Sequence, residues 1–483
     1  MTSGFRFPRS TPEAEGIPSQ AILDFVRAVE QHEHPLDALQ GFILIRHGKV
    51  VAEGWWEPYG PDIPHTFFSL SKSFTSTAIG LAVADGLLTV EDPVLSFFPE
   101  ESPSDPDENL KSMRVKHLLS MNTGHLEDTT GHVFRGSDDN WSRAFLSLPV
   151  ERQPGTWFVY NTAATYMLSA IITKLTGKTL LEYLRPRLLD PLGIVDATWE
   201  ADPRGISQGG TGLHATTEDI ARFGQLYLQN GMWQGTRIVS ENWIAEATAA
   251  HSDNSNTQTN SDWTAGYGYQ FWRNRTGGYR GDGAFGQYCI VLPEQDAVLA
   301  VNSGVRDMQA VLDKVWNHLL PAMQPQPLPA NPKARAELLD NLASLTLPLA
   351  EGQATPSGIS NRSGVSYKLE SNDLQLDSIK VDLADDRATI HAIDSRGEHP
   401  LEVGHGAWLK GTNDLHGGVS LPVAASGAWT SGNTYEARVC YYESEFCPVV
   451  RFQFGDDDIR LEFDPNVAWG TPAVTTIIGR RID

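Results

Sequence analysis

The stretch "FFSLSKSFTSTAIGLAVADG", residues 67–86, places Ser69 three positions before Lys72, ahead of a run of small and apolar residues. Residues three apart lie on one face of a helix, so a helix beginning near Ser69 would bring the Lys72 amine to the Ser69 hydroxyl. A serine needs an adjacent base to act as a nucleophile, and apolar surroundings lower a lysine pKa enough to supply one. The same residues are also compatible with an ordinary helix start, because serine commonly caps helices.

The composition is that of a globular protein with room for two or three domains. The chain has 483 residues, 40% of them hydrophobic and 20% charged, and a formal net charge of -23. Such a charge disfavours nucleic acid and anionic membranes as partners, because both would be repelled. We see no apolar run of the roughly 20 residues that span a membrane, and no apolar core of a secretory signal near residue 1. We therefore expect a cytoplasmic protein.

The secondary-structure pattern of the sequence changes at a proline-rich segment. "QPQPLPANP", residues 324–332, favours an extended linker. Helix and strand patterns mix before it, whereas "VVRFQFGDDDIRLEF", residues 449–463, alternates apolar and polar residues on both sides of a turn. The sequence thus predicts a first domain over residues 1–323 and an all-β, barrel-like domain over residues 333–483. The three cysteines are too few for a disulfide framework, and we expect free, buried thiols: Cys289, Cys440 and Cys447.

Two further segments, which follow the opening stretch along the chain, carry additional motifs. "PGTWFVYNTAATYMLSAIITKLTG" covers residues 154–177, and "RGDGAFGQYCIVLPEQDAVLAVNSG" covers residues 280–304. Over most of residues 10–320 the chain resembles the serine hydrolases related to class C β-lactamases and penicillin-binding proteins. The resemblance implies an α/β (α+β) β-lactamase/transpeptidase-like domain, with an antiparallel sheet flanked by helices. It also implies that the C-terminal all-β barrel-like domain is similar to the lipocalin-like barrels of some members.

The resemblance carries catalytic roles onto particular residues. In that family an S-x-x-K motif holds the nucleophile, which implies Ser69 as nucleophile and Lys72 as its activating partner. The tyrosine of a Y-x-N motif implies Tyr160 as a second base, and which of the two bases acts first is left open. The oxyanion would lie between two backbone amides. One is the Ser69 N–H, and aligning Gly283 with the glycine of the family's K-T-G or H-x-G triplet makes Ala284 the other.

Two departures from the family pattern bear on the substrate. Tyr160 is followed directly by Asn161, one position early for the motif's asparagine, and Thr162 takes the third position. The resemblance implies Asn161 as a substrate contact. The triplet region reads Gly281-Asp282-Gly283, with an acidic residue and no cation. We expect Asp282 to repel a penicillin carboxylate, so that the substrate is a neutral or cationic ester or amide and β-lactam hydrolysis is feeble.

Two rival signals are weaker. "GISQG", residues 205–209, spells the G-x-S-x-G of a nucleophile elbow, but it lacks the strand before and the helix directly after that an elbow requires. Ser207 is therefore expected to be a loop serine. "QHEHP", residues 31–35, and His125 with His132 lack metal-ligand spacing, so we expect no metal.

These observations predict a carboxylesterase that works through a Ser69 acyl-enzyme and needs no cofactor. An amidase or D-aminopeptidase, an acyltransferase and a weak β-lactamase are the alternatives within the class. A sensor or binding protein that is acylated without turnover is the alternative from another class. The expected partner is a small ester or amide, without nucleic acid or membrane, and a homo-oligomer is left open.

Overall fold

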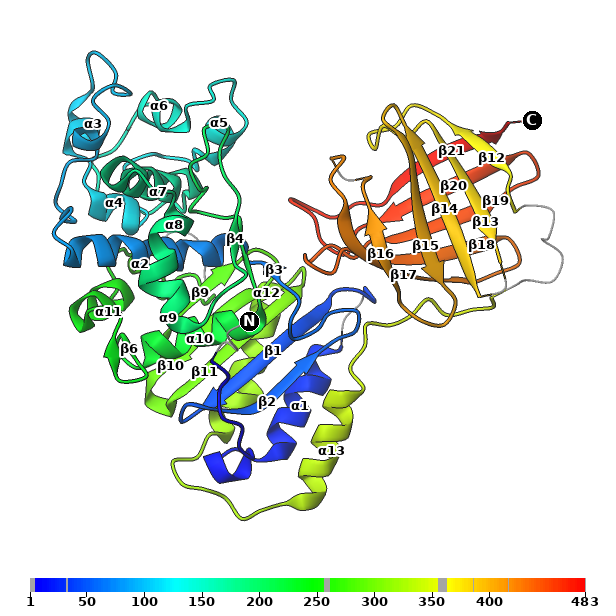
Figure 1. Ribbon diagram of the computed structural model, residues 1–483, viewed down its shortest axis with the longest axis horizontal. Coiled ribbons are helices and arrows are strands. Elements are labelled where there is room, and N and C mark those ends of the chain that lie inside the picture. Colours follow the sequence, from blue (N-terminus) through cyan, green and yellow to red (C-terminus); the bar gives the residue numbers. More distant parts are fainter. Residues whose placement is uncertain are drawn as a thin grey trace.

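The computed structural model describes residues 5–31, 34–255, 261–354, 363–384, 386–415 and 417–482. It contains two parts: a sheet covered by helices, and a separate β-barrel (Figure 1). Both predicted architectures are confirmed. Within the described residues, no helix is both long and apolar enough to cross a membrane. The three cysteines are free and buried, as expected.

The first domain is built on an antiparallel sheet of order β2-β1-β11-β10-β9-β8. Its first two strands meet in a two-residue turn, His47-Gly48, where both residues have positive φ. Such turns match the right-handed twist of a hairpin, and a glycine suits the second position. The strands are β1 (Ala38–Arg46), β2 (Lys49–Trp55), β8 (Trp272–Arg273), β9 (Tyr279–Gly283), β10 (Gln287–Leu292) and β11 (Ala297–Gly304).

The sheet is buried on both faces, which explains why its strands read as continuous apolar runs. Along β1, Phe42 and Leu44 join one core cluster, whereas Ile43 and Ile45 join the other. One face carries α1 (Ser19–Val29), α12 (Met308–Lys314) and α13 (Pro332–Ala343) (Figure 1). The other face carries α10 (Thr217–Leu228), α2 (Ser71–Ala84) and, beyond α2, α7 (Thr162–Thr176).

The helix α2 is buried on nearly every side, which fits its lack of a charged face. Gly80 allows this packing, because a Cβ there would lie 2.4 Å from the Trp243 ring. The surrounding helices are α3 (Glu108–Ser112), α4 (Val115–Leu119), α5 (Thr130–Phe134), α6 (Trp141–Leu146), α8 (Leu180–Leu184), α9 (Asp190–Leu192) and α11 (Glu241–Thr248). Short strands complete the domain: β3 (His65–Thr66), β4 (Thr198–Trp199), β5 (Leu213–Ala215), β6 (Met232–Trp233) and β7 (Thr236–Arg237).

The proline-rich segment lies along the first domain and leads into α13. The amide of Gln324 donates to the Gly16 carbonyl at 2.8 Å. The helix α13 then packs on α1, where Arg27 and Glu337 form an ion pair at 2.9 Å and Leu338 is buried. The structure therefore places α13 with the first domain, and the strands of the barrel begin only at Ser366.

The barrel is a sheet of order β15-β14-β13-β12-β21-β20-β19-β18-β17-β16, closed where Gly404 of β15 meets Ser426 of β17. Inward-pointing residues alternate along its strands, as the pattern around residues 449–463 predicted. The strands are β12 (Ser366–Leu369), β13 (Ser378–Leu383), β14 (Arg387–Asp394), β15 (Gly397–Gly404), β16 (Leu409–Asn413), β17 (Leu421–Trp429), β18 (Thr434–Cys440), β19 (Val449–Phe454), β20 (Asp458–Asp464) and β21 (Thr475–Arg481).

The barrel contacts the first domain through a loop between β18 and β19. The Glu443 carbonyl accepts the Thr66 amide at 3.1 Å, and the Ser444 carbonyl accepts the Tyr59 hydroxyl at 2.8 Å. Farther along, the Arg306 guanidinium donates to the Asn466 carbonyl at 2.6 Å. Since Thr66 is three residues from Ser69, the barrel lies directly beside the segment 67–86.

Candidate active site

Ser69 lies in a short 3-10 helix, η2 (Phe68–Leu70), immediately before α2 begins at Ser71. The predicted helix start is therefore confirmed. Phe68, the residue before the serine, has a φ of 44°, which is uncommon for a residue other than glycine. Residues in this conformation cluster at functional sites, where the surrounding structure offsets their strain. Ser69 is partly exposed, so a substrate can reach its hydroxyl.

Lys72 is buried and its amine has three oxygen partners. The Nζ atom lies 2.8 Å from Ser69 Oγ, 3.0 Å from Thr162 Oγ1 and 2.7 Å from the Gly210 carbonyl oxygen. A neutral amine has two N–H groups and one lone pair. If Thr162 and Gly210 accept the two N–H groups, the lone pair is left for the Ser69 proton. The geometry is therefore that of a base held against its nucleophile.

Burial lowers the pKa of Lys72 to about 7, because a charged amine is poorly solvated there. The carboxylates of Asp128 and Asp282 act in the opposite direction and raise the pKa, but by less than burial lowers it. A lysine with this pKa is partly neutral at physiological pH and can accept a proton.

We expect the turnover of a neutral ester to rise as the pH increases through about 7, where Lys72 loses its proton. Measuring kcat/KM for p-nitrophenyl butyrate from pH 5.5 to pH 9 checks this, because that parameter reports groups of the free enzyme. The Lys72→Arg variant should retain little activity and show no rise, since an arginine stays charged throughout. A flat profile in the wild-type protein would contradict the assignment of Lys72 as the base.

Tyr160 lies at the same site. Its ring lies against Lys72, whose Nζ atom is 4.9 Å from the ring centre. The ring stacks on Trp272 at 5.3 Å between centroids. Burial, together with the charge of Asp282, raises the pKa of Tyr160 above its usual value, although Ser69 is among the neighbours that lower it. Burial therefore disfavours both a phenolate at Tyr160 and a charged amine at Lys72.

The strand β9 approaches the Ser69 turn so closely that only glycine fits at two positions. A Cβ on Gly283 would lie 2.2 Å from the Phe67 carbonyl oxygen, and one on Gly281 would lie 2.6 Å from Ser73 Oγ. Ala284 follows directly, at the end of β9. The Ala284 amide thus lies on the strand that runs beside the nucleophile, where the sequence predicts an oxyanion donor.

Asp282 is buried in an ion pair rather than free. Its carboxylate accepts from Arg280 Nε at 3.0 Å and from Trp263 Nε1 at 3.1 Å. Burial raises the pKa of Asp282, while the Arg280 guanidinium lowers it. The repulsion of an anionic substrate that the sequence suggested is therefore largely offset by Arg280. The ion pair instead fixes the strand that carries Gly283 and Ala284.

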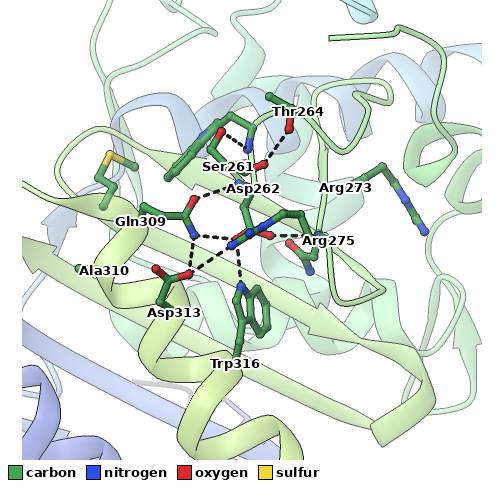
Figure 2. A network of polar contacts seen from close by, with 12 residues as sticks. Ser261, Asp262, Thr264, Arg273, Arg275, Gln309, Ala310, Asp313 and Trp316 are labelled. Atoms are coloured by element: carbon green, nitrogen blue, oxygen red, sulfur yellow. Dashed lines mark hydrogen bonds and ion pairs between the residues drawn. The ribbon is translucent and has the colours of Figure 1, made fainter. Parts of the chain in front are cut away.

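A second buried acid, Asp262, lies in a network of polar contacts with Arg275, Gln309 and Trp316 (Figure 2). Its side chain accepts from Gln309 at 2.7 Å, from Trp316 Nε1 at 3.0 Å and from Arg275 at 3.1 Å. Its backbone carbonyl accepts from Arg280 at 3.3 Å. Asp262 therefore ties α12 and the segment before β8 to the buried arginine of β9.

The structure places Asn161 at the start of α7, where its Nδ2 has no hydrogen-bond partner among the described residues. Asn161 is fully buried and caps α7, where its Oδ1 accepts from the Ala164 amide at 3.3 Å and from Thr129 Oγ1 at 3.0 Å. Its neighbour Thr162, in the third position of the motif, contacts Lys72. The threonine at the third position of the motif, where the family has asparagine, was the sequence signal for this contact with Lys72.

Gly210 is the site residue that sequence reasoning missed, because its contribution is a backbone carbonyl. It follows the "GISQG" segment, and a Cβ there would lie 2.6 Å from Thr162 Cγ2. Ser207 of that segment is buried, and its carbonyl accepts from Ser169 Oγ at 2.6 Å. The rival motif is thus a loop that packs on α7 and brings the Gly210 carbonyl to Lys72.

Four aromatic rings lie at the rim of the site, two from each domain. Phe68 and Phe285 are 5.6 Å apart, and Trp469 of the C-terminal part lies 5.7 Å from Phe68 and 5.1 Å from Phe285. Phe446, from the loop between β18 and β19, lies 6.1 Å from Phe285. The barrel domain therefore contributes apolar surface next to the residues that flank Ser69 and Ala284.

Nothing in the described part of the chain groups three or more His, Cys, Asp or Glu side chains as metal ligands. His32 and Glu33 of the "QHEHP" segment lie outside the described residues. His125 is buried and pairs through Nδ1 with Thr123 Oγ1 at 2.8 Å.

Comparisons with known proteins identify the family of the chain. Residues 29–316 match the beta-lactamase family, over more than half of the chain. The 6-aminohexanoate-dimer hydrolase of Paenarthrobacter ureafaciens is 26% identical over 276 residues, which cover 53% of this chain and 70% of that protein. Lovastatin esterase of Penicillium rubens is 28% identical over 156 residues, which cover 27% of this chain and only 38% of the esterase.

A solved structure extends the fold comparison to both domains. The octameric penicillin-binding protein homologue from Pyrococcus abyssi covers 95% of this chain and 99% of its own, with a TM-score of 0.50 and 17% identity. At that identity the likeness concerns the fold. With the match over residues 29–316, the conclusion is that the chain is a serine hydrolase belonging to the beta-lactamase family.

Proposed function

We propose that the protein is a carboxylesterase that forms an acyl-enzyme on Ser69. The observation that carries this proposal is the Lys72 amine, which has acceptors for two N–H groups and Ser69 Oγ as its third partner. Neutral Lys72 takes the proton as Ser69 Oγ bonds to the substrate carbonyl carbon. The negative oxygen that results is stabilised by the amides of Ser69 and Ala284.

The collapse of this intermediate needs a proton for the leaving group. The Lys72 ammonium holds one, 2.8 Å from Ser69 Oγ, and the Tyr160 hydroxyl, on the ring packed against Lys72, would relay it to the leaving oxygen. The leaving oxygen departs with that proton and the acyl group remains on Ser69 Oγ. Water then bonds to the acyl carbon while neutral Lys72 takes a proton from it. The ammonium returns that proton to Ser69 Oγ as the bond between the acyl carbon and Oγ breaks, which releases the carboxylic acid and restores Ser69.

An ester is favoured over an amide because an alcohol leaves with less help from an acid than an amine does. The raised pKa of Tyr160 makes it a weak acid for expelling an amine. Amide hydrolysis is the second candidate, because the Lys72 ammonium, with a pKa of about 7, is itself a competent proton donor. The name of the 6-aminohexanoate-dimer hydrolase is consistent with that alternative.

A matched panel tests the proposal. We expect p-nitrophenyl butyrate to be turned over with a kcat/KM at least about 100-fold above that of butyryl p-nitroanilide, and nitrocefin to be the slowest. The position where the family has a cation holds Gly281, whose Cβ direction is filled by Leu70 and Ser73, so the described site offers no counter-ion there for a β-lactam carboxylate. Nitrocefin turnover equal to ester turnover would contradict the proposal. A stable butyryl adduct without turnover would establish the sensor alternative.

A further inference from the structure

A pocket of about 400 Å³ lies between the two domains, next to the active-site turn. Its apolar wall includes Phe68 from the first domain and Leu421, Tyr441 and Phe446 from the barrel. This volume is within the range of about 300–1,000 Å³ that is common for small-molecule sites. Neither domain forms this pocket alone, because each supplies part of the wall.

The pocket lies beside the turn that carries Ser69, although Ser69 itself is not among its lining residues. Phe68, which lines it, directly precedes Ser69. Phe446, which also lines it, lies 6.1 Å from Phe285, the residue after Ala284. The wall is thus shared with the neighbours of the nucleophile and of the expected oxyanion donor. A chain attached to the carbonyl group at Ser69 would have to pass Phe68 to enter this space.

The charged residues of the pocket are mainly acidic. Glu200 and Glu443 line it, with His214 paired to Glu200 at 3.2 Å, and no lysine or arginine is among its lining residues in the described part of the chain. Glu443 is half-buried, and its backbone carbonyl is held by the Thr66 amide at 3.1 Å. Carboxylates beside apolar walls attract cations more strongly than they do in open water, and they repel anions.

We propose that this interdomain pocket is a substrate subsite that takes an apolar chain ending in a cationic ammonium group. The proposal rests on the proposed Ser69 hydrolysis and adds a substrate class to it. The apolar wall binds the chain, and Glu200 and Glu443 select the positive end. The barrel domain would therefore take part in choosing the substrate, through Glu443 and Phe446.

The test uses substrate pairs that differ only in charge. On the acyl side, the p-nitrophenyl ester of 6-(trimethylammonio)hexanoate is compared with that of 7,7-dimethyloctanoate, in which a carbon replaces the nitrogen. On the alcohol side, butyrylcholine is compared with 3,3-dimethylbutyl butyrate. We expect kcat/KM to favour the cation about tenfold in one of the two series, at low ionic strength, and less at high salt.

Variants then locate the preference. Glu443→Gln and Glu200→Gln should each reduce the cation preference several-fold, whereas Glu294→Gln, an exposed acid at the far end of β10, should leave it unchanged. Leu421→Trp, which fills the pocket, should raise KM for the long substrates and leave p-nitrophenyl acetate turnover unaffected. The acetate ester does not reach the pocket, so it monitors Ser69 chemistry and folding separately.

The outcomes separate the two proposals. Normal acetate turnover with no cation preference in either series would overturn the subsite and leave the esterase proposal standing. A preference that persists in Glu443→Gln and Glu200→Gln would also overturn it, because other charges would then be responsible. Loss of all ester turnover in the wild-type protein would instead contradict the proposed function.

Discussion

Replacing Ser69 with alanine is expected to lower kcat for p-nitrophenyl butyrate by at least about 10⁴-fold, because the acyl group then has no oxygen to attach to. The fold should be retained, since Ser69 is partly exposed and its loss leaves Lys72 bonded to Thr162 and Gly210. Steady-state rates give the first readout. Intact-protein mass spectrometry after brief exposure gives the second, where the butyryl adduct of the wild-type protein should be absent from the variant.

Ser207→Ala is the matched control, because Ser207 is the serine of the rival motif. Its carbonyl, rather than its hydroxyl, makes the contact to Ser169, so the variant should keep most of the wild-type turnover. Full activity in Ser69→Ala together with loss of activity in Ser207→Ala would move the nucleophile to the loop and overturn the site described above.

The fold and the central pair of residues could be predicted because their signals are local. Ser69 and Lys72 are three residues apart, so a single helix turn brings them together whatever the rest of the chain does. The alternation over residues 449–463 likewise depends only on neighbours along the strand. The role of Tyr160 could be predicted only from the resemblance to the family, because long-range packing is what brings its ring to Lys72.

The remaining site features depend on contacts between distant segments, which the sequence alone does not reveal. The Gly210 carbonyl reaches Lys72 from 138 positions along the chain. From the sequence, Asp282 is expected to be a free acid near the substrate, yet the fold buries it, and there it pairs with Arg280 and also accepts from Trp263 of a separate segment. The proline-rich segment was predicted to separate the two domains. In the structure the helix α13 follows it and still packs on α1 of the first domain, through Leu338 and the Arg27–Glu337 ion pair.

Replacing Lys72 with methionine should lower kcat for p-nitrophenyl butyrate by about 10³-fold to 10⁴-fold, since the base is removed while the nucleophile remains. Methionine has a similar length and no charge, so the cost of burying an amine disappears and the midpoint of thermal unfolding should not fall greatly. The residual activity should lose the rise near pH 7. Circular dichroism melts and a pH series on the same protein preparation provide these measurements.

The comparison with Tyr160→Phe decides which residue is the base. If Lys72 removes the Ser69 proton, Lys72→Met should lose more activity than Tyr160→Phe, and only the phenylalanine variant should retain the rise near pH 7. This order follows from the two pKa shifts, because burial makes the amine of Lys72 easier to deprotonate and the phenol of Tyr160 harder to deprotonate. A larger loss in Tyr160→Phe, with the rise near pH 7 retained in Lys72→Met, would assign the base to the tyrosine and leave Lys72 as the cation that stabilises its phenolate.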